Sequence, residues 1–192
     1  MSTHRQQEII DASLDLISKQ GIQGLTIKNL SKKIGITEPA IYRHFDNKIC
    51  ILLAILDYFK EKSEAMFSQQ ANSNDNSLQR IERIFQGHFM AFEKMPSLVS
   101  VIFSEEIFRN EPTLQQKIVD IMDRNSGVIK AIVAEGQAKG EIKSEVESKY
   151  LTLIIIGALR MMVKRWQMGD KSFKHKQEVR SLFGSIKQLI ES

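Results

Sequence analysis

The sequence has a single cysteine, only three prolines and no long uninterrupted hydrophobic run. One cysteine excludes a disulfide framework within the chain and is typical of a reducing compartment. The most apolar stretch, 151–163, is too short to cross a membrane and contains Arg160. The N-terminal segment also lacks the apolar core of a signal peptide. We therefore expect a cytoplasmic chain with no membrane partner.

Sets of residues with the spacing of a catalytic or metal site are also missing. There is no glycine-rich phosphate loop and no cluster of histidine and cysteine. Glu105 and Glu106 are adjacent, and neighbouring residues on a helix point in different directions, which argues against an acid–base pair. We expect no enzyme activity, no cofactor and no metal. The histidines are scattered over four positions: His4, His44, His88 and His175.

The residues that are abundant favour helices. Hydrophobic residues make up 42% and charged residues 26% of the chain, which is ordinary for a globular protein. Leucine, isoleucine, lysine, glutamate and glutamine are plentiful, and these favour an all-α fold. The net charge of +4 permits nucleic-acid binding but does not identify it. Evidence for DNA binding must therefore come from where the charged residues lie in the sequence.

Residues 25–52 predict two short helices separated by a tight turn, followed by the start of a long helix. Thr26 and Thr37 are suited to cap the two short helices, and Gly35 permits the turn between them. Ile41 and Phe45, four residues apart, form the inward face of the second helix. Its other side chains point outward or to the edge. A short helix of this kind, exposing tyrosine, arginine and histidine, is typical of the recognition helix of a helix-turn-helix, which enters the DNA major groove.

The same stretch resembles the signature of the tetracycline-repressor (TetR) family of bacterial regulators. The resemblance covers about the first quarter of the chain, and beyond it extends only to length and helical layout. It implies a dimer with two-fold symmetry, a palindromic operator, and release by a ligand that moves the helix starting near Asn47. The matching positions are Thr26, Leu30, Ser31, Gly35, Ile36, Ile41, Tyr42, His44, Phe45 and Lys48.

Hydrophobic periodicity predicts nine helices in all, which agrees with the TetR architecture. We expect a three-helix DNA-binding domain over 1–46 and a larger ligand-binding and dimerisation domain over 47–192. Asp46 is expected to cap the long helix that follows the motif. One apolar helix is expected over 97–108, and Ser144 with Glu147 predicts a capping box for a helix starting at 145. Ser172 is expected to cap the last helix.

The candidate contacts to double-stranded DNA fall into two groups. Lys28 and Lys48 lie in first turns of helices, where free N–H groups, the helix dipole and an ammonium together suit a phosphate. The alternative is that both lysines are solvated surface charges. The resemblance implies backbone contacts from the matching Thr26, Tyr42, His44 and Lys48. Base contacts are expected from Thr37, Glu38, Pro39, Ala40 and Arg43, with Arg43 suited to guanine and Glu38 either accepting from cytosine or only capping the helix.

The last two predicted helices are apolar enough to need a partner, and we expect them to form the homodimer interface. The alternative is that their stripes only line the core of one chain. The predicted interface residues are Ile155, Leu159, Met162, Val179, Leu182, Phe183 and Ile186.

Aromatic and soft side chains in the middle of the chain are suited to a pocket for a hydrophobic or amphipathic small molecule. The alternative is a plain core, since phenylalanine and methionine stripes commonly fill one. Two other functions stay open: a TetR-like protein controlled by a protein partner, and a helical ligand-binding protein that binds no DNA. The candidate pocket residues are Phe85, His88, Phe89, Phe92, Phe103, Phe108, Met122 and Trp166.

Overall fold

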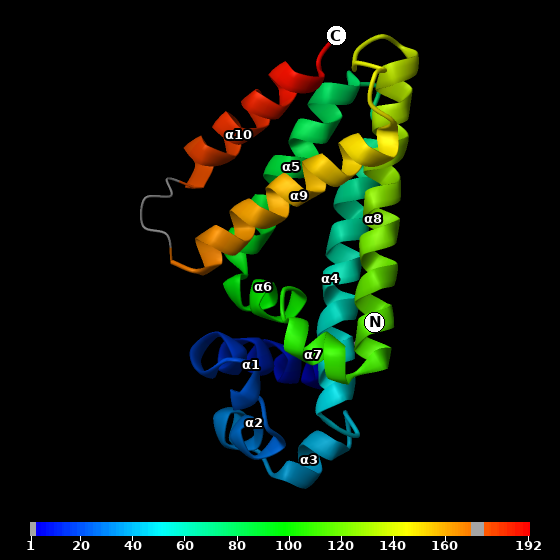
Figure 1. The fold of residues 1–192 in the computed structure, drawn as a ribbon. Coiled ribbons are helices and arrows are strands. Elements are labelled where there is room, and N and C mark those ends of the chain that lie inside the picture. The colour runs from blue at the N-terminus through cyan, green and yellow to red at the C-terminus, as the bar shows by residue number, and fades with distance from the viewer. Residues whose placement is uncertain (1–2, 170–174) are drawn as a thin grey trace. The chain divides into compact units, whose positions relative to one another are not determined.

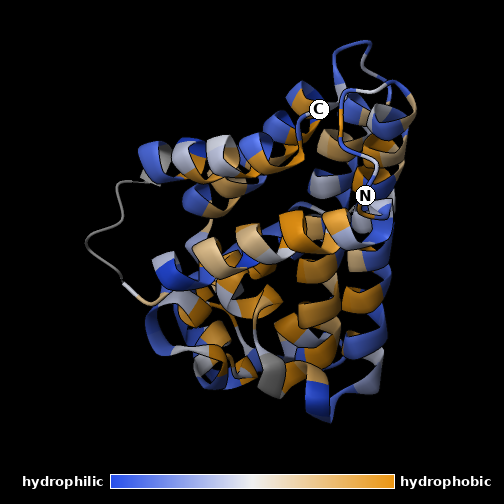
Figure 2. Ribbon diagram, turned by 45° about the horizontal axis from the view of Figure 1, so that its top comes forward, coloured by the Kyte–Doolittle hydropathy of each residue, from blue (hydrophilic) through white to orange (hydrophobic). Residues whose placement is uncertain are grey.

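The computed structural model describes residues 3–169 and 175–192, without the side chains of 105, 106, 175 and 176. The predicted cap Ser172 and the side chains of Glu105 and Glu106 therefore lie outside the described residues. The described residues form helices connected by loops, with one isolated antiparallel bridge between Ile142 and Glu191, which confirms the predicted all-α class (Figure 1). Hydrophobic and hydrophilic residues alternate along these helices, as expected of amphipathic elements (Figure 2). In order they are α1 (His4–Gln20), the 3₁₀ helix η1 (Ile22–Gly24), α2 (Ile27–Ile34), α3 (Glu38–Tyr42), α4 (Lys48–Ala71), α5 (Ser77–Lys94), α6 (Pro96–Ile102), α7 (Glu105–Asn110), α8 (Pro112–Ala138), α9 (Ser148–Gln167) and α10 (His175–Ile190).

The described part of the chain thus has ten α-helices where nine were predicted. The difference lies in the segment expected to form one helix over 97–108. Phe103 closes α6, and Ser104 then has an extended backbone with φ −83° and ψ 93°, so that α7 begins afresh at Glu105. The hydrophobic pattern runs through this break, which is why periodicity alone did not reveal it.

The helices divide into two compact units. Unit 1 comprises Met1–Lys60 and Met95–Val119, and unit 2 comprises Glu61–Lys94 and Asp120–Ser192. Each unit is therefore built from two separate stretches of sequence, and α4 and α8 contribute to both. The predicted domain boundary after Asp46 stays a prediction.

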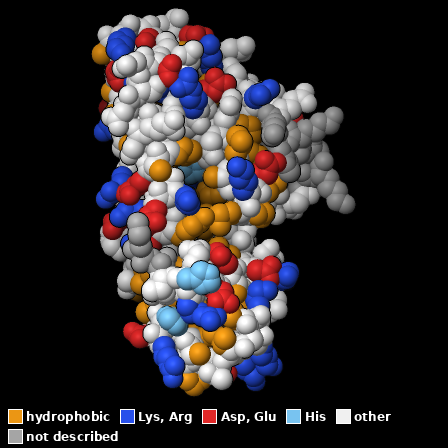
Figure 3. Space-filling view, turned by 180° about the vertical axis from the view of Figure 1, so that it is seen from behind, with side chains coloured by type: hydrophobic (Ala, Val, Ile, Leu, Met, Phe, Trp, Pro, Cys, Tyr) orange, Lys and Arg blue, Asp and Glu red, His pale blue; other side chains and the backbone are white. Residues whose placement is uncertain are grey.

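In unit 1, α1 packs against α2, η1 and α6. Its inward face is fully buried, with Ile9 and Ile17 at 1% exposure or less. Asp15 on the outer face accepts hydrogen bonds from Lys33 of α2 and from Lys19, and these bonds lower the pKa of its carboxyl. Lysine and arginine side chains are spread over the surface of the region that holds α1 to α3, in the lower part of Figure 3. The small helices of unit 1 are thus held by one apolar face and a surface ion pair.

In unit 2, α5 is the central helix and packs against both α9 and α10. It buries Ile81, Ile84, Phe85 and Phe89 almost completely. At the surface of unit 2, an ion pair joins Arg124 of α8 to Glu64 of α4, with 2.6 Å between nitrogen and oxygen.

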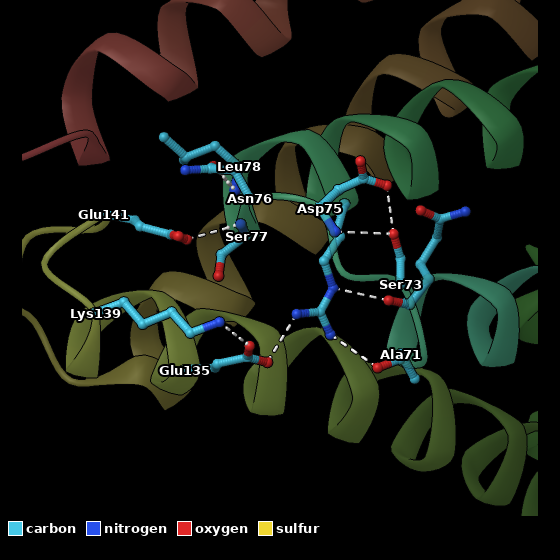
Figure 4. Close-up of polar contacts among 11 residues, drawn as sticks. Ala71, Ser73, Asp75, Asn76, Ser77, Leu78, Glu135, Lys139 and Glu141 are labelled. Carbon is cyan, nitrogen blue, oxygen red and sulfur yellow. Dashed lines mark hydrogen bonds and ion pairs between the residues drawn. The ribbon is translucent and has the colours of Figure 1, made fainter.

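A buried arginine joins three helices of unit 2. The guanidinium of Arg80 in α5 donates to the carbonyl oxygens of Gln70 at 2.8 Å and Ala71 at 3.0 Å, at the C-terminal end of α4. Its third bond, 2.7 Å long, goes to the carboxylate of Glu135 in α8, which also accepts from Lys139 (Figure 4). Because the last carbonyls of a helix have no partner within it, Arg80 acts as a side-chain cap for α4.

The connection between α8 and α9 has irregular structure, and the predicted capping box in it is wrong. The helix begins at Ser148, and Glu147 precedes it without a capping bond from its side chain. The reason is that the amide of Gln137 donates to the carbonyl oxygens of Lys143 and Val146, which holds this segment as a loop. The loop also meets the end of the chain, since the N–H of Lys143 donates to the carbonyl of Ile190 at 2.8 Å.

Within the described ranges, no helix combines the length and the apolar character that spanning a bilayer requires.

Candidate DNA-binding surface and interior site

The helix-turn-helix forms as the sequence predicts, except that the expected side-chain cap from Thr37 is absent. The hydroxyl of Thr26 accepts the N–H of Asn29 at 3.1 Å and so caps α2. Gly35 closes α2 with φ +79°, in the left-handed region that glycine adopts without strain. The N–H groups of Gly35 and Ile36 both return to the carbonyl of Ser31, at 2.9 and 3.1 Å. These bonds end α2 and turn the chain within the three residues 35–37, so that α3 starts in a new direction.

The second helix, α3, has only five residues and one buried face. Ile41 is fully buried, and Phe45, just after the helix, is 7% exposed. Thr37 occupies the N-cap position with an extended backbone, but its hydroxyl makes no capping bond. Thr37 is an exposed residue, which suits its hydroxyl to contact a base edge or a phosphate. The buried side chains of Ile41 and Phe45 hold the recognition helix against unit 1, and the rest of its surface is accessible.

The structure brings all ten predicted DNA contacts together in unit 1. Tyr42 is 48% exposed, which is unusual for an aromatic residue and leaves its ring and hydroxyl accessible. Ala40, His44 and Lys48 are half-buried. The other exposed members of the set are Thr26, Lys28, Thr37, Glu38, Pro39 and Arg43. The roles of all ten residues as DNA contacts stay predictions.

The start of α4 differs from the prediction in two respects. Its cap is Asn47 rather than Asp46, because the side-chain oxygen of Asn47 accepts the N–H of Cys50 at 3.0 Å. Lys48 does not simply extend into solvent, since its ammonium donates to the carbonyl of Ile22 in η1 at 3.0 Å. Lys48 therefore ties η1 to α4. No local sequence pattern could predict this contact, because Ile22 and Lys48 lie 26 residues apart.

An aromatic cluster fills part of the interior of unit 2. His88 packs edge-on against Phe67, with 5.4 Å between ring centroids, and against Phe92 at 5.1 Å. Phe89 packs against Trp166 at 5.9 Å, and Phe85 against Phe183 at 5.7 Å. Edge-on packing at these distances is favourable between aromatic rings. Five of the eight predicted pocket residues thus lie in this cluster: Phe85, His88, Phe89, Phe92 and Trp166.

The other three predicted pocket residues lie elsewhere. Phe103 and Phe108 belong to unit 1. Met122 is 40% exposed on α8, where its sulfur lies 3.4 Å from the guanidinium of Arg160. Sequence reasoning missed Phe67 and Phe183 as members of the cluster. Phe67 follows Phe59 and Ser63 at four-residue spacing on the buried side of α4, and this spacing is the signal that could have found it.

The imidazole of His88 predicts a pH dependence of stability. Its Nδ1 is shielded from solvent, and burial lowers the pKa of His88 to about 4 from the ordinary 6.5. As pH falls, the unfolded chain therefore takes up this proton first, and the folded state loses stability between about pH 6.5 and pH 4, by at most about 1.4 kcal/mol per pH unit.

Urea unfolding at several pH values should show this dependence of stability on pH, and His88→Leu should flatten it. Phe92→Leu, which removes an apolar neighbour, should lower stability at every pH and keep the slope. An unchanged slope in His88→Leu would contradict the assignment.

The predicted dimer residues lie mostly inside unit 2. Leu182 is half-buried, and the other six are 7% exposed or less. They lie in the core between α5, α9 and α10 of the single chain, and their role in a dimer stays a prediction. The apolar residues that α9 and α10 do expose are different ones: Tyr150, Leu153, Ile154, Met161 and Leu189.

Comparison with known proteins agrees with this arrangement of helices. The family of bacterial regulatory proteins named tetR matches residues 9–55, and the family described as YsiA-like protein, C-terminal region, matches residues 57–190. A fatty acid metabolism regulator protein of Bacillus subtilis (strain 168) is 24% identical over 189 residues, covering 96% of this chain and 93% of its own length. The nucleoid occlusion factor SlmA of Vibrio campbellii is 22% identical over 173 residues, covering 90% of this chain and 88% of its own length.

The fold is shared with solved structures of regulators. The transcriptional regulator FadR of Bacillus subtilis, crystallised in complex with stearoyl-CoA, superposes with a TM-score of 0.75 at 24% identity, over 97% of each chain. The two family matches together span nearly the whole chain, and the first contains the helix-turn-helix built from α2 and α3. The chain therefore belongs to the TetR family of bacterial regulatory proteins, which are DNA-binding transcriptional regulators.

Proposed function

We propose that this regulator is a repressor that binds a palindromic operator as a homodimer and is released by an amphipathic small molecule. The observation that carries the DNA-binding part is α3, a five-residue helix with Ile41 buried beneath it and Thr37, Tyr42 and Arg43 exposed around it. A helix presented in this way fits the major groove, which is wide enough to admit it.

The contacts would divide between bases and backbone. Arg43 would pair with guanine, and the apolar faces of Pro39 and Ala40 would meet thymine methyl groups. Thr26 and Lys28, exposed at the start of α2, would hold a phosphate at the N-terminal end of that helix. Tyr42 and His44 would contact the sugar–phosphate backbone. Two chains related by two-fold symmetry would read two equivalent half-sites.

Selection of bound fragments from random genomic DNA tests this proposal. The expected result is enrichment of one inverted repeat, with half-sites about ten base pairs apart or a multiple of that spacing. The same selection with a double variant, Tyr42→Ala with Arg43→Ala, serves as the control and should enrich nothing. Failure of the unaltered protein to enrich any palindrome would overturn the proposal and favour a helical protein that binds no DNA.

The ligand part of the proposal depends on the aromatic cluster around His88. Such a cluster offers an apolar, adaptable lining for a chain or ring system. The Bacillus subtilis relatives are named for fatty acid metabolism and for a complex with stearoyl-CoA, and an acyl thioester is therefore the first probe. Stearoyl-CoA should release the protein from its operator, whereas coenzyme A alone, which lacks the acyl chain, should not.

A second candidate is control by a protein partner. The observation that favours it is the close packing of the rings of the cluster, which also describes an ordinary filled core. The Vibrio relative is named a nucleoid occlusion factor rather than a metabolic regulator. Operator binding that is unaffected by acyl thioesters, free fatty acids and steroids would favour this candidate over the ligand sensor.

Lys48 provides a test of the proposed phosphate contacts. Lys48→Ala should weaken binding to the operator and to random DNA by the same factor, because a phosphate contact carries no sequence information. It should also lower the salt slope of log affinity by about one unit per half-site. Affinity measured at several salt concentrations checks this, with Lys130→Ala, an exposed lysine of α8, as the control. An unchanged salt slope together with a less stable protein would mean that Lys48 only ties η1 to α4.

A further inference from the structure

A small cleft opens in unit 1 where η1, the start of α4 and the end of α7 meet. Its volume is about 170 Å³, and it is open to solvent. In Figure 1, α7 lies beside the first turns of α4. All residues that line the cleft belong to unit 1, so it shares no residue with the aromatic cluster of unit 2. The cleft is therefore a separate candidate site for a ligand.

Four aliphatic side chains form an apolar wall in this cleft. Leu52 and Ile107 are buried, and Ile22 and Ile49 are half-buried. A cavity of about 150 Å³ lined by side chains of this kind is large enough to bind benzene. The wall therefore suits an aliphatic group or a single aromatic ring.

The polar part of the lining contains one ammonium and one carboxylate. The ammonium is that of Lys48, and its hydrogen bond of 3.0 Å to the carbonyl of Ile22 holds it at the cleft. The carboxylate is that of Glu111, a half-buried residue directly after α7. Among the side chains that the structure describes, the carboxylate of Glu111 has no hydrogen bond and no ion pair. The exposed amides of Gln23 and Asn110 complete the polar lining.

These two charges decide which kind of small molecule fits. A cation would be repelled by Lys48, and an anion would be repelled by Glu111. A neutral apolar molecule would take water away from the carboxylate of Glu111 without giving it a partner, which is unfavourable. A zwitterion offers an opposite charge to both side chains and can form a charge-assisted hydrogen bond with each.

We propose that the cleft binds a small apolar α-amino acid. Its carboxylate lies against Lys48, its ammonium against Glu111 and its side chain against the aliphatic wall. This site goes beyond the proposed function and does not depend on it, because the amino acid would bind whether or not the protein binds DNA. Lys48 is also a predicted phosphate contact, so the amino acid would compete with DNA for the same ammonium.

Titration with L-phenylalanine in the absence of DNA tests the site. Methyl NMR of isoleucine-labelled protein gives a local readout, because an aromatic ring shifts the methyl signals that it contacts. Ile22, Ile49 and Ile107 should shift, whereas Ile129 and Ile190 of unit 2 should not. The expected dissociation constant is about 1 mM, as is usual for a ligand of this size.

Two analogues of phenylalanine separate the contributions of the two charges. The first, 2-phenylethylamine, lacks the carboxylate, and the second, 3-phenylpropionate, lacks the ammonium. Each loses one charge-assisted hydrogen bond and should bind about tenfold more weakly than L-phenylalanine. Equal binding of all three molecules would show an apolar cleft without the proposed recognition and would overturn the inference.

Two variants assign the charges to their partners. In Glu111→Gln, L-phenylalanine should bind no better than 3-phenylpropionate, because the partner of the ammonium is gone. In Lys48→Met, it should bind no better than 2-phenylethylamine. Glu145→Gln removes a carboxylate from an exposed position in unit 2 and is the matched control, which should keep the full affinity.

A third variant fills the cleft without changing its charge. Ile49→Phe should abolish the binding of all three molecules, and thermal unfolding checks that each variant is folded. The inference fails if the three isoleucine signals of the unaltered protein do not move at about ten times the expected dissociation constant. It also fails if Glu111→Gln and Glu145→Gln bind L-phenylalanine equally well.

Discussion

Replacing Arg43 by alanine is expected to lower affinity for the operator by at least about thirtyfold, while binding to random DNA changes little. A guanidinium paired with guanine is worth about 1–3 kcal/mol of discrimination, and a palindrome presents the contact twice, which gives about 2–6 kcal/mol. Arg43 is exposed at the end of α3, where its side chain has room to reach a base edge. The expected loss is therefore specific to sequences with guanine at one or two positions in each half-site.

Measurement of affinity across a library of single-base operator variants checks this expectation. At the base pairs that Arg43 reads, the variant should bind all four bases about equally. At the other base pairs of the operator, it should keep the base preference of the unaltered protein. Arg5→Ala removes the same charge from an exposed position on α1 and is the matched control, since it lies outside the recognition helix. Equal weakening on every sequence would place Arg43 on the phosphate backbone, and an unaltered profile would remove it from base readout.

Replacing Arg80 by methionine is expected to lower the free energy of unfolding by about 3 kcal/mol, which corresponds to roughly 10 °C in melting temperature for a chain of this size. Methionine keeps much of the length of the side chain and removes all three bonds of the guanidinium. The carbonyl oxygen of Ala71 then loses this donor at the end of α4, that of Gln70 keeps only the N–H of Ser73 at 3.3 Å, and Glu135 loses a cation. An unsatisfied acceptor in a buried site costs more than the net value of the bond it made.

Arg83→Met on the same helix is the matched control for Arg80→Met. The guanidinium of Arg83 is about half exposed and pairs with Asp75 at the surface, so its loss should cost less than about 1 kcal/mol. Thermal and urea unfolding of the two variants should therefore differ clearly. Similar losses in both would mean that the cap on α4 contributes no more than a surface ion pair.

The same network predicts acid sensitivity. Hydrogen bonds from Lys139 and Arg80 lower the pKa of Glu135 to about 2 from the ordinary 4.5. A carboxyl with a depressed pKa in the folded state contributes stability above its unfolded pKa, and that contribution is lost as pH falls from about 4.5 towards 2. Arg80→Met should reduce this acid-dependent loss, because one of the two donors is gone.

The parts of the structure that the sequence predicted are those set by neighbouring residues. The cap of Thr26 and the left-handed turn at Gly35 depend on bonds that span three or four residues, and both formed as expected. The buried pair Ile41 and Phe45 followed from helical spacing alone. The helix-turn-helix could therefore be predicted in detail, because little of its geometry depends on the rest of the chain.

The parts that the sequence missed depend on contacts between distant residues. Lys48 and Ile22 meet only because η1 folds back onto the start of α4. The loop before α9 is held by Gln137, which no local pattern in the loop itself reveals. The sequence showed that α9 is apolar enough to need a partner, but it could not tell which side of the helix packs within the chain. Ile155 and Leu159 proved to be core, and Leu153 and Met161 proved to be exposed.

The interleaving of the two units has a consequence for how the protein folds as it is made. Unit 1 needs residues up to Val119, because α6 packs against α1, so its last helices arrive only after the first stretch of unit 2 has been synthesised. Unit 2 remains incomplete until residues 190–192 have been made, since the N–H of Lys143 donates to the carbonyl of Ile190 and the N–H of Ser192 donates to the carbonyl of Glu141. A ribosome stalled at about residue 182 would hold a chain whose DNA-binding helices are complete and whose second unit still lacks the segment that bonds to Glu141 and Lys143.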